Sequence, residues 1–539
     1  MVWIPSASTR CHWGLMKNKV AIIGHMVADP TFLPLSGDLS SDRVTIRPFN
    51  YTRVVTPDGF LADHIAFLKR ELGLLRADRF SVWEMQGCTG LLLASHLRRH
   101  RVDVCLENYI DDDIAESAFD RLRDFDPNIV VISTTFMLTQ KHLLTVTQRI
   151  RQEVPNAWIL AGGHHIHATL SSLKTGEARK YLSRIDVDGV VNDSQGEAAL
   201  LDFCRRFPDE LNKVPNLIWR DHQGITHFND TRPEQNDIDS TVIDLKGVEE
   251  DSVISIRTAR SCKFKCAFCS YPEMAGPVSL MDLDHVMTTL RQARDLGAKA
   301  VIFVDDTFNV PKDRFEALLD RMLQENINVP WYSFLRCQFI DERIVKKMAR
   351  SGCAGVFLGI ESGSDMILKN MKKGAVKDFY WTGIEWLRGE GILTVGSFIV
   401  GFPGDTAETV SETAEFIDQS GLDYHFTQPF YYLHNTPIHR KAEKSGLQGS
   451  GLRWKHNTMN WQEAMTHISN MFCDVTNSTF INPDYTLWEI AFLRARGMGN
   501  DDIKEYRKRI NQMTREQMRT YSLSGGNPTS RPEAPSILN

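Results

Sequence analysis

Three cysteines, Cys262, Cys266 and Cys269, lie within eight residues of one another, shortly after an apolar run at residues 253–256. Thiol groups spaced this closely reach one centre only if the chain loops tightly around it. Thiolates of this kind hold iron–sulfur clusters, and a four-iron cluster usually takes four of them. A set of three with no obvious fourth leaves one iron atom free for another ligand. The spacing therefore predicts a four-iron cluster with one open coordination position.

Two other uses of these cysteines fit the sequence less well. A structural zinc site has four closed ligands, typically in C-x2-C pairs, whereas the first gap here is three residues. A disulfide framework is also disfavoured, because the chain has ten cysteines in 539 residues and those outside the trio are scattered. This usage is typical of a reduced cytosolic protein.

Length and composition describe an ordinary globular chain. A length of 539 residues predicts about three domains, and 42% hydrophobic with 24% charged residues is typical of such proteins. The formal charge of −6 argues against broad nucleic-acid binding. No apolar run approaches the ~18 residues of a membrane span, and no signal-peptide pattern is recognisable. We expect a cytoplasmic protein with a small-molecule substrate and neither a nucleic-acid nor a membrane partner.

The stretch around the three cysteines resembles the cluster loop of the radical S-adenosylmethionine (SAM) family. In that family the open iron binds the amino and carboxylate groups of SAM, and an electron then splits it to a 5′-deoxyadenosyl radical. The resemblance implies that Cys262, Cys266 and Cys269 are both cluster ligands and catalytic residues, and that Phe268 borders the adenine. It also implies an external electron donor such as a flavodoxin or ferredoxin.

The chain after the linker alternates strands and helices. Apolar, β-branched runs predict six strands, at residues 253–256, 300–304, 331–335, 355–359, 393–400 and 426–432, with helical patterns between them. Six such repeats give a (β/α)6 partial TIM barrel, the radical SAM core, over residues 250–445. In barrels the chemistry lies at the carboxyl ends of the strands.

Those strand ends carry segments that resemble the SAM-binding motifs of the family. They include the "G-I-E-S-G" segment at 359–363 and a glycine-rich stretch at 396–404. Beside Phe268, the resemblance implies SAM contacts from Asp305, Asp306, Arg336, Glu361, Ser362 and Gly401.

Residues 1–225 predict a doubly wound, Rossmann-like α/β domain. Strands are expected at 19–23, 102–106, 129–133, 157–161 and 188–191, with helices at 61–75, 91–100, 114–125 and 141–153. In such sheets, ligands bind beyond the carboxyl ends of the strands.

The order of these segments resembles the cobalamin-binding domain of one branch of the radical SAM family. The implied cobalamin contacts are Ser133, Thr134, Gly162, Gly163, Gly196 and Glu197. The Asp-x-His-x-x-Gly motif that supplies a lower cobalt ligand is missing from the sequence. We therefore expect no protein histidine on cobalt, although three histidines lie at 164–167. A domain that has lost its corrinoid and serves as a scaffold is the alternative.

The remaining segments complete the expected organisation. Residues 226–249 are a polar linker, 446–522 a helical C-terminal region, and 523–539 a disordered tail. His456, Thr458 and Glu463 are candidate substrate contacts, with helix capping as the alternative for Thr458.

Three functions fit the sequence. The first is a cobalamin-dependent radical SAM methyltransferase that uses two SAM per turnover for C- or P-methylation of a small, natural-product-type metabolite. The "W-x-H-x-T-M" segment at 454–459 resembles the P-methylase subfamily of phosphinate biosynthesis. The second is a corrinoid-dependent ring-forming cyclase, and the third a non-catalytic iron–sulfur electron carrier. A methylthiotransferase is disfavoured, because that family has a second cysteine trio in its N-terminal domain.

Overall fold

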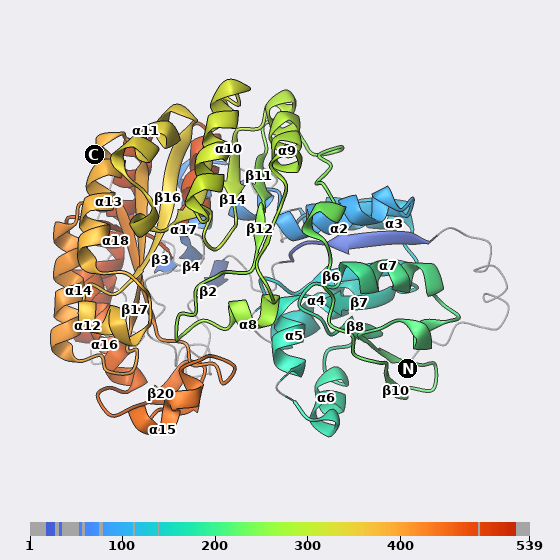
Figure 1. Ribbon diagram of the computed structural model, residues 1–539. Helices are drawn as coiled ribbons and strands as arrows, with labels where there is room; N and C mark the ends of the chain where they lie inside the picture. Colours follow the sequence, from blue (N-terminus) through green and yellow to red (C-terminus); the bar gives the residue numbers. More distant parts are fainter. Residues whose placement is uncertain are drawn as a thin grey trace.

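The computed structural model describes residues 18–26, 32–34, 53–55, 60–74, 79–110, 114–137, 140–171, 173–482 and 486–523. Most of the tail that we expected to be disordered lies outside these residues. Two α/β units lie side by side, with the first sheet and the second sheet on opposite sides of Figure 1.

The first unit contains a seven-stranded sheet in the order β10-β9-β8-β7-β6-β1-β5. Five neighbouring strands are parallel, whereas β9 and β10 add an antiparallel edge. Because β1 lies between β5 and β6, the direction of winding reverses there, which makes this a topological switch point. The strands are β1 Lys19–Ile23, β5 Asp103–Glu107, β6 Ile129–Ser133, β7 Trp158–Gly162, β8 Gly189–Val191, β9 Leu217–Arg220 and β10 Thr226–Phe228.

Helices cover both faces of this sheet, which confirms the doubly wound fold. One core contains buried side chains of α2 (Cys88–Arg99) and α7 (Glu197–Arg206). The other contains those of α3 Ala115–Phe125, α4 Gln140–Glu153, α5 His164–Leu170 and α6 Thr175–Leu182. The sequence did not predict α5 or α6. The three histidines at 164–167, which follow the end of β7, open the short helix α5.

The second unit is a parallel sheet in the order β11-β14-β15-β16-β17-β18-β21. The partial barrel is thereby confirmed. Its strands are β11 Val253–Ile256, β14 Ala300–Phe303, β15 Trp331–Leu335, β16 Cys353–Glu361, β17 Leu393–Val400, β18 Tyr424–Pro429 and β21 Thr479–Phe480. The connecting helices are α9 Leu283–Leu296, α10 Lys312–Gln324, α11 Glu342–Arg350, α12 Asp365–Asn370, α13 Lys377–Gly389 and α14 Ala407–Gln419.

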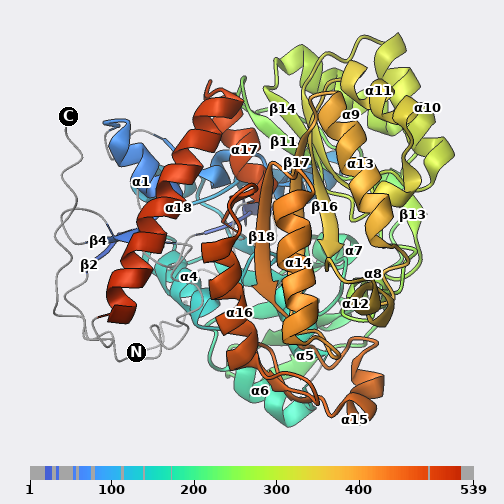
Figure 2. The same ribbon diagram turned by 90° about the vertical axis from the view of Figure 1, so that its left-hand side faces the viewer.

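The C-terminal region differs from the expected all-helical segment. Two residues, Thr479 and Phe480, pair with β18 as a seventh strand, which is too short to give a readable period. A hairpin of β19 (Gln448–Ser450) and β20 (Arg453–Lys455) precedes α16 (Trp461–Asp474). Figure 2 shows α16 and α18 (Asn500–Leu523) on the outside, alongside β18 and α14.

Helix α17 (Thr486–Ala495) lies against the inner side of the barrel. It packs on β11, β14 and β16, and Leu487, Ile490 and Leu493 are fully buried. Trp488 contacts the ring of Phe334 at 5.5 Å between centroids. A helix that is apolar on most of its faces is typical of a buried position. This helix therefore closes the barrel beneath the strand ends.

Part of the N-terminal chain packs with the barrel. Helix α1 (His64–Glu71) follows a small sheet of β2 (Phe32–Pro34), β4 (Phe60–Asp63) and β3 (Arg53–Val55). The Tyr506 hydroxyl of α18 donates to the His64 carbonyl. The Gln86 backbone also pairs with Ile254 at the edge of the second sheet. These contacts fix the first unit against the second.

Three further helices or strands are short. They are β12 (Ala259–Arg260), α8 (Tyr271–Ala275) and β13 (Ser279–Leu280), which frame the cysteine loop. Within the part of the chain that the structure describes, we find no helix with the length and apolar character needed to cross a bilayer.

Candidate active site

The three cysteines occupy the loop between β12 and α8 and line one cavity of about 210 Å³, here called the cysteine cavity. The loop is pinned by backbone hydrogen bonds: the Cys269 amide donates to the Cys266 carbonyl, and the Ala267 amide to the Met371 carbonyl. Burial raises the pKa of the Cys269 thiol to about 11, so ligation would have to displace its proton.

Among the described residues, no three His, Cys, Asp or Glu side chains are arranged around a single ion position. A four-iron cluster attaches each thiolate to a different iron atom, so its sulfur ligands need not meet at one point. The three cysteines share one cavity without forming the closed four-ligand arrangement of structural zinc. This arrangement fits a four-iron cluster better than a single zinc ion.

Arg336 lies beside the cysteine loop. Its guanidinium donates to the Cys266 sulfur at 3.4 Å and to the Lys373 carbonyl at 3.0 Å, and stacks 3.6 Å from the Phe264 ring centroid. The backbone of Arg336 is bonded in both directions to the buried Asn309 side chain. A fixed cation at this place stabilises negative charge on the Cys266 sulfur.

Glu361 and Lys373 form a buried ion pair on the wall of the cysteine cavity. Their side chains are 2.8 Å apart and are 10% and 6% exposed. Glu361 has a φ of +72°, a conformation that non-glycine residues rarely adopt and that is found preferentially at functional sites. A Cβ at Gly359 would lie 2.8 Å from a Glu361 carboxylate oxygen, so a side chain there would displace the ion pair.

The expected SAM residues divide into two groups. Phe268, Asp306, Arg336 and Glu361 line the cysteine cavity. By contrast, the lining does not include Asp305, Ser362 or Gly401.

Each of those three has a structural contact instead. The Asp305 carboxylate accepts from the Thr258 amide and hydroxyl and from the Ala259 amide, and burial raises its pKa. The Ser362 hydroxyl bonds that of Thr413. Gly401 has a φ of +89°, and a Cβ there would lie 2.3 Å from the Trp454 ring.

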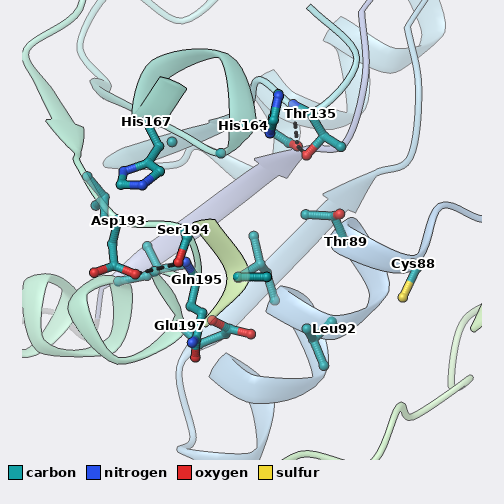
Figure 3. Close-up of a pocket in the computed structure, with 18 of the residues that line it drawn as sticks. Cys88, Thr89, Leu92, Thr135, His164, His167, Asp193, Ser194, Gln195 and Glu197 are labelled. Atoms are coloured by element: carbon teal, nitrogen blue, oxygen red, sulfur yellow. Dashed lines mark hydrogen bonds between the residues drawn. The ribbon is translucent and has the colours of Figure 1, made fainter. Parts of the chain in front are cut away.

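A second cavity of about 360 Å³, here called the interdomain cavity, lies between the first sheet and the barrel. Its first wall comes from the carboxyl ends of β6, β7 and β8 and from α2. Figure 3 shows side chains from these elements around the same hollow: Thr89 and Leu92 on α2, His164 and His167 on α5, and Asp193, Ser194 and Gln195 after β8. Its second wall comes from the barrel, with Arg257, Arg260, Tyr271, Met274 and Asp306.

Five of the six expected cobalamin residues line this cavity: Ser133, Gly162, Gly163, Gly196 and Glu197. Thr134 is fully buried, and its hydroxyl donates to the Gly162 carbonyl, so it supports the strand end from behind. Gly163 has a φ of +107°, and a Cβ would lie 3.3 Å from the Thr134 amide nitrogen. Glycine therefore provides a wall of bare backbone at the end of β7.

The three histidines of α5 differ in their surroundings. His164 and His167 line the interdomain cavity, whereas His165 bonds the Tyr181 hydroxyl at 3.1 Å. His167 also approaches the Asn192 side-chain oxygen at 3.2 Å. Burial, followed by the charge of His167, lowers the pKa of His164. The imidazole of His164 is therefore neutral at pH 7.

Tyr271 and Asp306 line both cavities, so the two sites adjoin. Burial, followed by the charge of Asp305, raises the pKa of the Asp306 carboxyl to about 6. A carboxyl group with this pKa can hold or release a proton close to neutral pH.

The candidate substrate contacts His456, Thr458 and Glu463 are not among the lining residues of either cavity. His456 bonds the Gly401 carbonyl at 3.0 Å, and its ring stacks on Trp454. Asn460 caps α16, with Glu463 completing the capping box, whereas Thr458 bonds His456. The capping role considered for Thr458 is therefore wrong, and Asn460 fills it.

A family model described as the Radical SAM superfamily matches residues 256–417, which include the cysteine loop. Residues 256–417 are a radical SAM domain. The radical SAM match extends from the end of β11 into α14 and therefore contains both walls of the cysteine cavity.

Two curated relatives match this chain over a longer stretch than the radical SAM domain alone. The uncharacterized methyltransferase PH0819 of Pyrococcus horikoshii is 27% identical over 350 residues, which are 62% of this chain and 74% of the relative. Bacteriochlorophyllide d C-12(1)-methyltransferase of Chlorobaculum tepidum is 30% identical over 308 residues, 56% of this chain. The chain spans 63% of that second relative, less than two thirds of its length.

Two solved structures share the fold. Radical SAM methyltransferase TsrM of Kitasatospora setae, with tryptophan and a SAM analogue bound, aligns with a TM-score of 0.54 at 16% identity. The alignment covers 69% of this chain and 77% of TsrM. The cobalamin-dependent SAM radical enzyme OxsB aligns with a TM-score of 0.54 at 15% identity, over 74% of this chain and 64% of OxsB. At these identities the likeness concerns the fold.

Sequence reasoning missed several residues of the radical SAM site. Lys373 lies in a polar stretch with no motif, and its pairing with Glu361 depends on the fold. Sequence reasoning also missed Arg257 and Arg260 of the interdomain cavity and Tyr271, which lines both cavities. All three flank the cysteine loop in the sequence, and this proximity was the available signal.

Replacing Glu361 by alanine is expected to weaken SAM binding, because it removes a carboxylate from the cysteine cavity. It also leaves Lys373 buried without its partner, at a cost of about 3–5 kcal/mol. Glu361→Gln keeps an acceptor for Lys373 and should lose SAM affinity with a smaller loss of stability. Equilibrium dialysis of SAM against anaerobic, cluster-loaded protein, paired with thermal unfolding, measures both. Equal SAM affinity in the wild type and both variants would limit Glu361 to positioning Lys373.

Proposed function

We propose that this radical SAM enzyme is a cobalamin-dependent methyltransferase acting on a small metabolite. The observation that carries the proposal is the junction of the two cavities, which share Tyr271 and Asp306. A substrate held at that junction lies between the cysteine loop and the strand ends of the first sheet. Methyl transfer by this route needs both sites within reach of one substrate.

The residues of the interdomain cavity fit a large, amide-bearing ligand such as a corrinoid. Gly162 and Gly163 present backbone without side chains, and Ser133 and Thr135 add hydroxyl groups to the same wall. The cavity lies at the carboxyl ends of β6 to β8, where doubly wound sheets bind ligands. Cobalamin bound there would supply a methyl carrier, and a cluster on the three cysteines would supply the reductant for SAM.

The chain's own residues have separable roles in this scheme. Cys262, Cys266 and Cys269 would hold the cluster, with Arg336 fixing the Cys266 sulfur. The Asp306 carboxyl, open to both cavities, would hold or accept a proton beside the substrate. Helix α17 closes the barrel below and limits access of water to the reacting groups.

The names of the relatives support methyl transfer as the reaction class. Two relatives and one solved structure are methyltransferases by name. The finer assignment to P-methylation of a phosphinate rests on the segment at 454–459. There Trp454 and His456 pack on Gly401, a contact that explains both residues without a phosphinate. Phosphinate methylation is thus one candidate within the proposed class.

Ring formation is the second candidate, favoured by one specific comparison. Anaerobic magnesium-protoporphyrin IX monomethyl ester cyclase of Cereibacter sphaeroides is 24% identical over 351 residues, 61% of this chain and 55% of the relative. The same two cavities would serve such a reaction.

The two candidates differ in how they consume SAM. A methyltransferase of this type should use two SAM molecules per product, releasing one S-adenosylhomocysteine and one 5′-deoxyadenosine. One SAM cannot both donate its methyl group and yield the adenosyl radical. Quantifying both products by mass spectrometry, with methyl-labelled SAM and a candidate substrate, tests this ratio. Deoxyadenosine formed alongside converted substrate but without S-adenosylhomocysteine would exclude methyl transfer and favour ring formation.

A further inference from the structure

Two arginines that line the interdomain cavity have buried hydrogen-bond donors without a partner among the described residues. Arg260 is 7% exposed, and its Nη2 donates to the Asn236 carbonyl. Its Nε and Nη1 are buried and have no hydrogen-bond partner within the described ranges, and the same is true of Arg257 Nε. Both side chains line the cavity.

Buried donors on a cation are costly to leave unmatched. Such groups are nearly always satisfied in folded proteins, by the chain, by water or by a bound ion. Three unmatched nitrogen atoms on two neighbouring guanidinium groups therefore indicate a missing partner that carries acceptors. Arginine presents a planar fork of donors that matches carboxylate and phosphorus oxyacid groups.

The three acids of the cavity lining are engaged in different ways, and the described part of the chain gives Arg260 no ion pair with any of them. The Glu197 carboxylate is paired with Arg257 at 3.2 Å and also accepts a hydrogen bond from the side-chain amide of Asn236 at 3.1 Å. The Asp193 carboxylate accepts from the Gln195 and Glu234 backbone amides. Among the described residues, Asp306, the third acid of the lining, forms no ion pair with either arginine. Among the described residues, Glu197 is thus the one lining acid that forms an ion pair with these arginines, and Arg260 has no ion-pair partner.

The position of Arg260 connects this charge to the reaction centre. Arg260 ends β12, two residues before Cys262, and the cavity it lines shares Tyr271 and Asp306 with the cysteine cavity. A group bound by Arg260 therefore lies beside the cysteine loop and also within the cavity at the strand ends.

We propose that Arg257 and Arg260 form an oxyanion-binding site that holds a carboxylate or phosphorus oxyacid group of the substrate. The site orients the substrate by its anionic end, so that a neutral analogue lacking that group binds poorly. The assignment to the substrate rests on the proposed function, whereas the existence of an anion site does not. A second source of the same chemistry is the phosphate in the nucleotide tail of cobalamin.

Anion binding is measured by calorimetry on cluster-loaded, corrinoid-free enzyme at low ionic strength. The probes are acetate and methylphosphinate, with neutral acetamide as the matched control. Wild-type enzyme should bind both anions and not acetamide. Arg260→Gln should weaken anion binding by about tenfold or more, because truncating one partner of a buried charged hydrogen bond has a large effect. Arg453→Gln, at an exposed position of strand β20, should leave anion binding unchanged.

Corrinoid binding separates the two sources of the anion. Cobinamide lacks the nucleotide phosphate, so it is titrated beside hydroxocobalamin. If Arg260→Gln leaves the affinities for both corrinoids equal to those of wild type, the anion belongs to the substrate. A selective loss of hydroxocobalamin affinity would assign the site to the cofactor and overturn the proposal. If wild type binds neither corrinoid, the proposed function fails while the anion titration still decides the site.

Stability of the variant is checked by iron content and thermal unfolding. If Arg260→Gln does not retain its cluster, the measurement is repeated with Arg260→Lys. Lysine keeps the positive charge but lacks the forked donors of arginine, so an intermediate anion affinity is expected. Failure of wild-type enzyme to bind either anion, or equal binding by wild type and the Arg260 variant, would overturn the proposal.

Discussion

Replacing Cys262, Cys266 and Cys269 together by alanine is expected to reduce bound iron from about four atoms per chain to none, and to abolish SAM cleavage. The three thiols line one cavity, and the described part of the chain has no other cysteine in that lining. Cys269 lies in a desolvated position where burial raises its pKa to about 11, so cluster assembly must displace its proton. Iron and sulfide content, with electron paramagnetic resonance of the reduced protein, measure the loss.

Two buried cysteines supply the matched control. Cys337 and Cys353 belong to the barrel core, and neither lines the cysteine cavity. Cys337→Ala and Cys353→Ala remove thiols that are buried like that of Cys266 and should retain full iron content, with some loss of stability from the space left behind. Zinc at one atom per chain, with no iron after anaerobic reconstitution, would contradict the cluster.

The barrel was readable from the sequence because its strands are buried on both faces. Strand β17, whose eight residues are all buried, appears in the sequence as a mostly apolar run that also contains Thr394 and Ser397. By comparison, β21 has two residues and α5 seven, too few to show a period. The packing of α1 against α18 joins residues more than 400 positions apart, and no local pattern encodes it.

The candidate site was predictable where local spacing carries the chemistry. The three cysteines are close to one another in the sequence, and they line the cysteine cavity. Gly162 and Gly163 are likewise neighbours, and they line the interdomain cavity. Asp305 and Asp306 show the limit of this approach. Beyond the end of β14, Asp306 lines both cavities, whereas the Asp305 carboxylate accepts hydrogen bonds from Thr258. Sequence could not assign the two roles, because both residues carry the same carboxylate.

Replacing Gly162 by tryptophan is expected to abolish corrinoid binding while leaving the iron content unchanged. Gly162 lines the interdomain cavity at the end of β7, and an added Cβ would meet Val191 at 3.7 Å, an ordinary contact. The backbone at Gly162 therefore accepts a side chain, whose bulk would occupy the cavity. Gly163→Trp is a poorer probe, because its φ of +107° strains any other residue and would confuse misfolding with blockage.

Gly176→Trp provides the matched control, since Gly176 is exposed on α6 of the same unit and has nothing within 4 Å of an added Cβ. Titration of anaerobic protein with hydroxocobalamin, followed by absorbance after gel filtration, gives the bound corrinoid. The wild type and Gly176→Trp should bind about one per chain, and Gly162→Trp none. Because the cysteine loop belongs to the other unit, all three proteins should retain the cluster and cleave SAM without substrate at similar rates. If the wild type binds no corrinoid at micromolar concentrations, the first unit is a scaffold, and any methyl transfer must proceed without cobalamin.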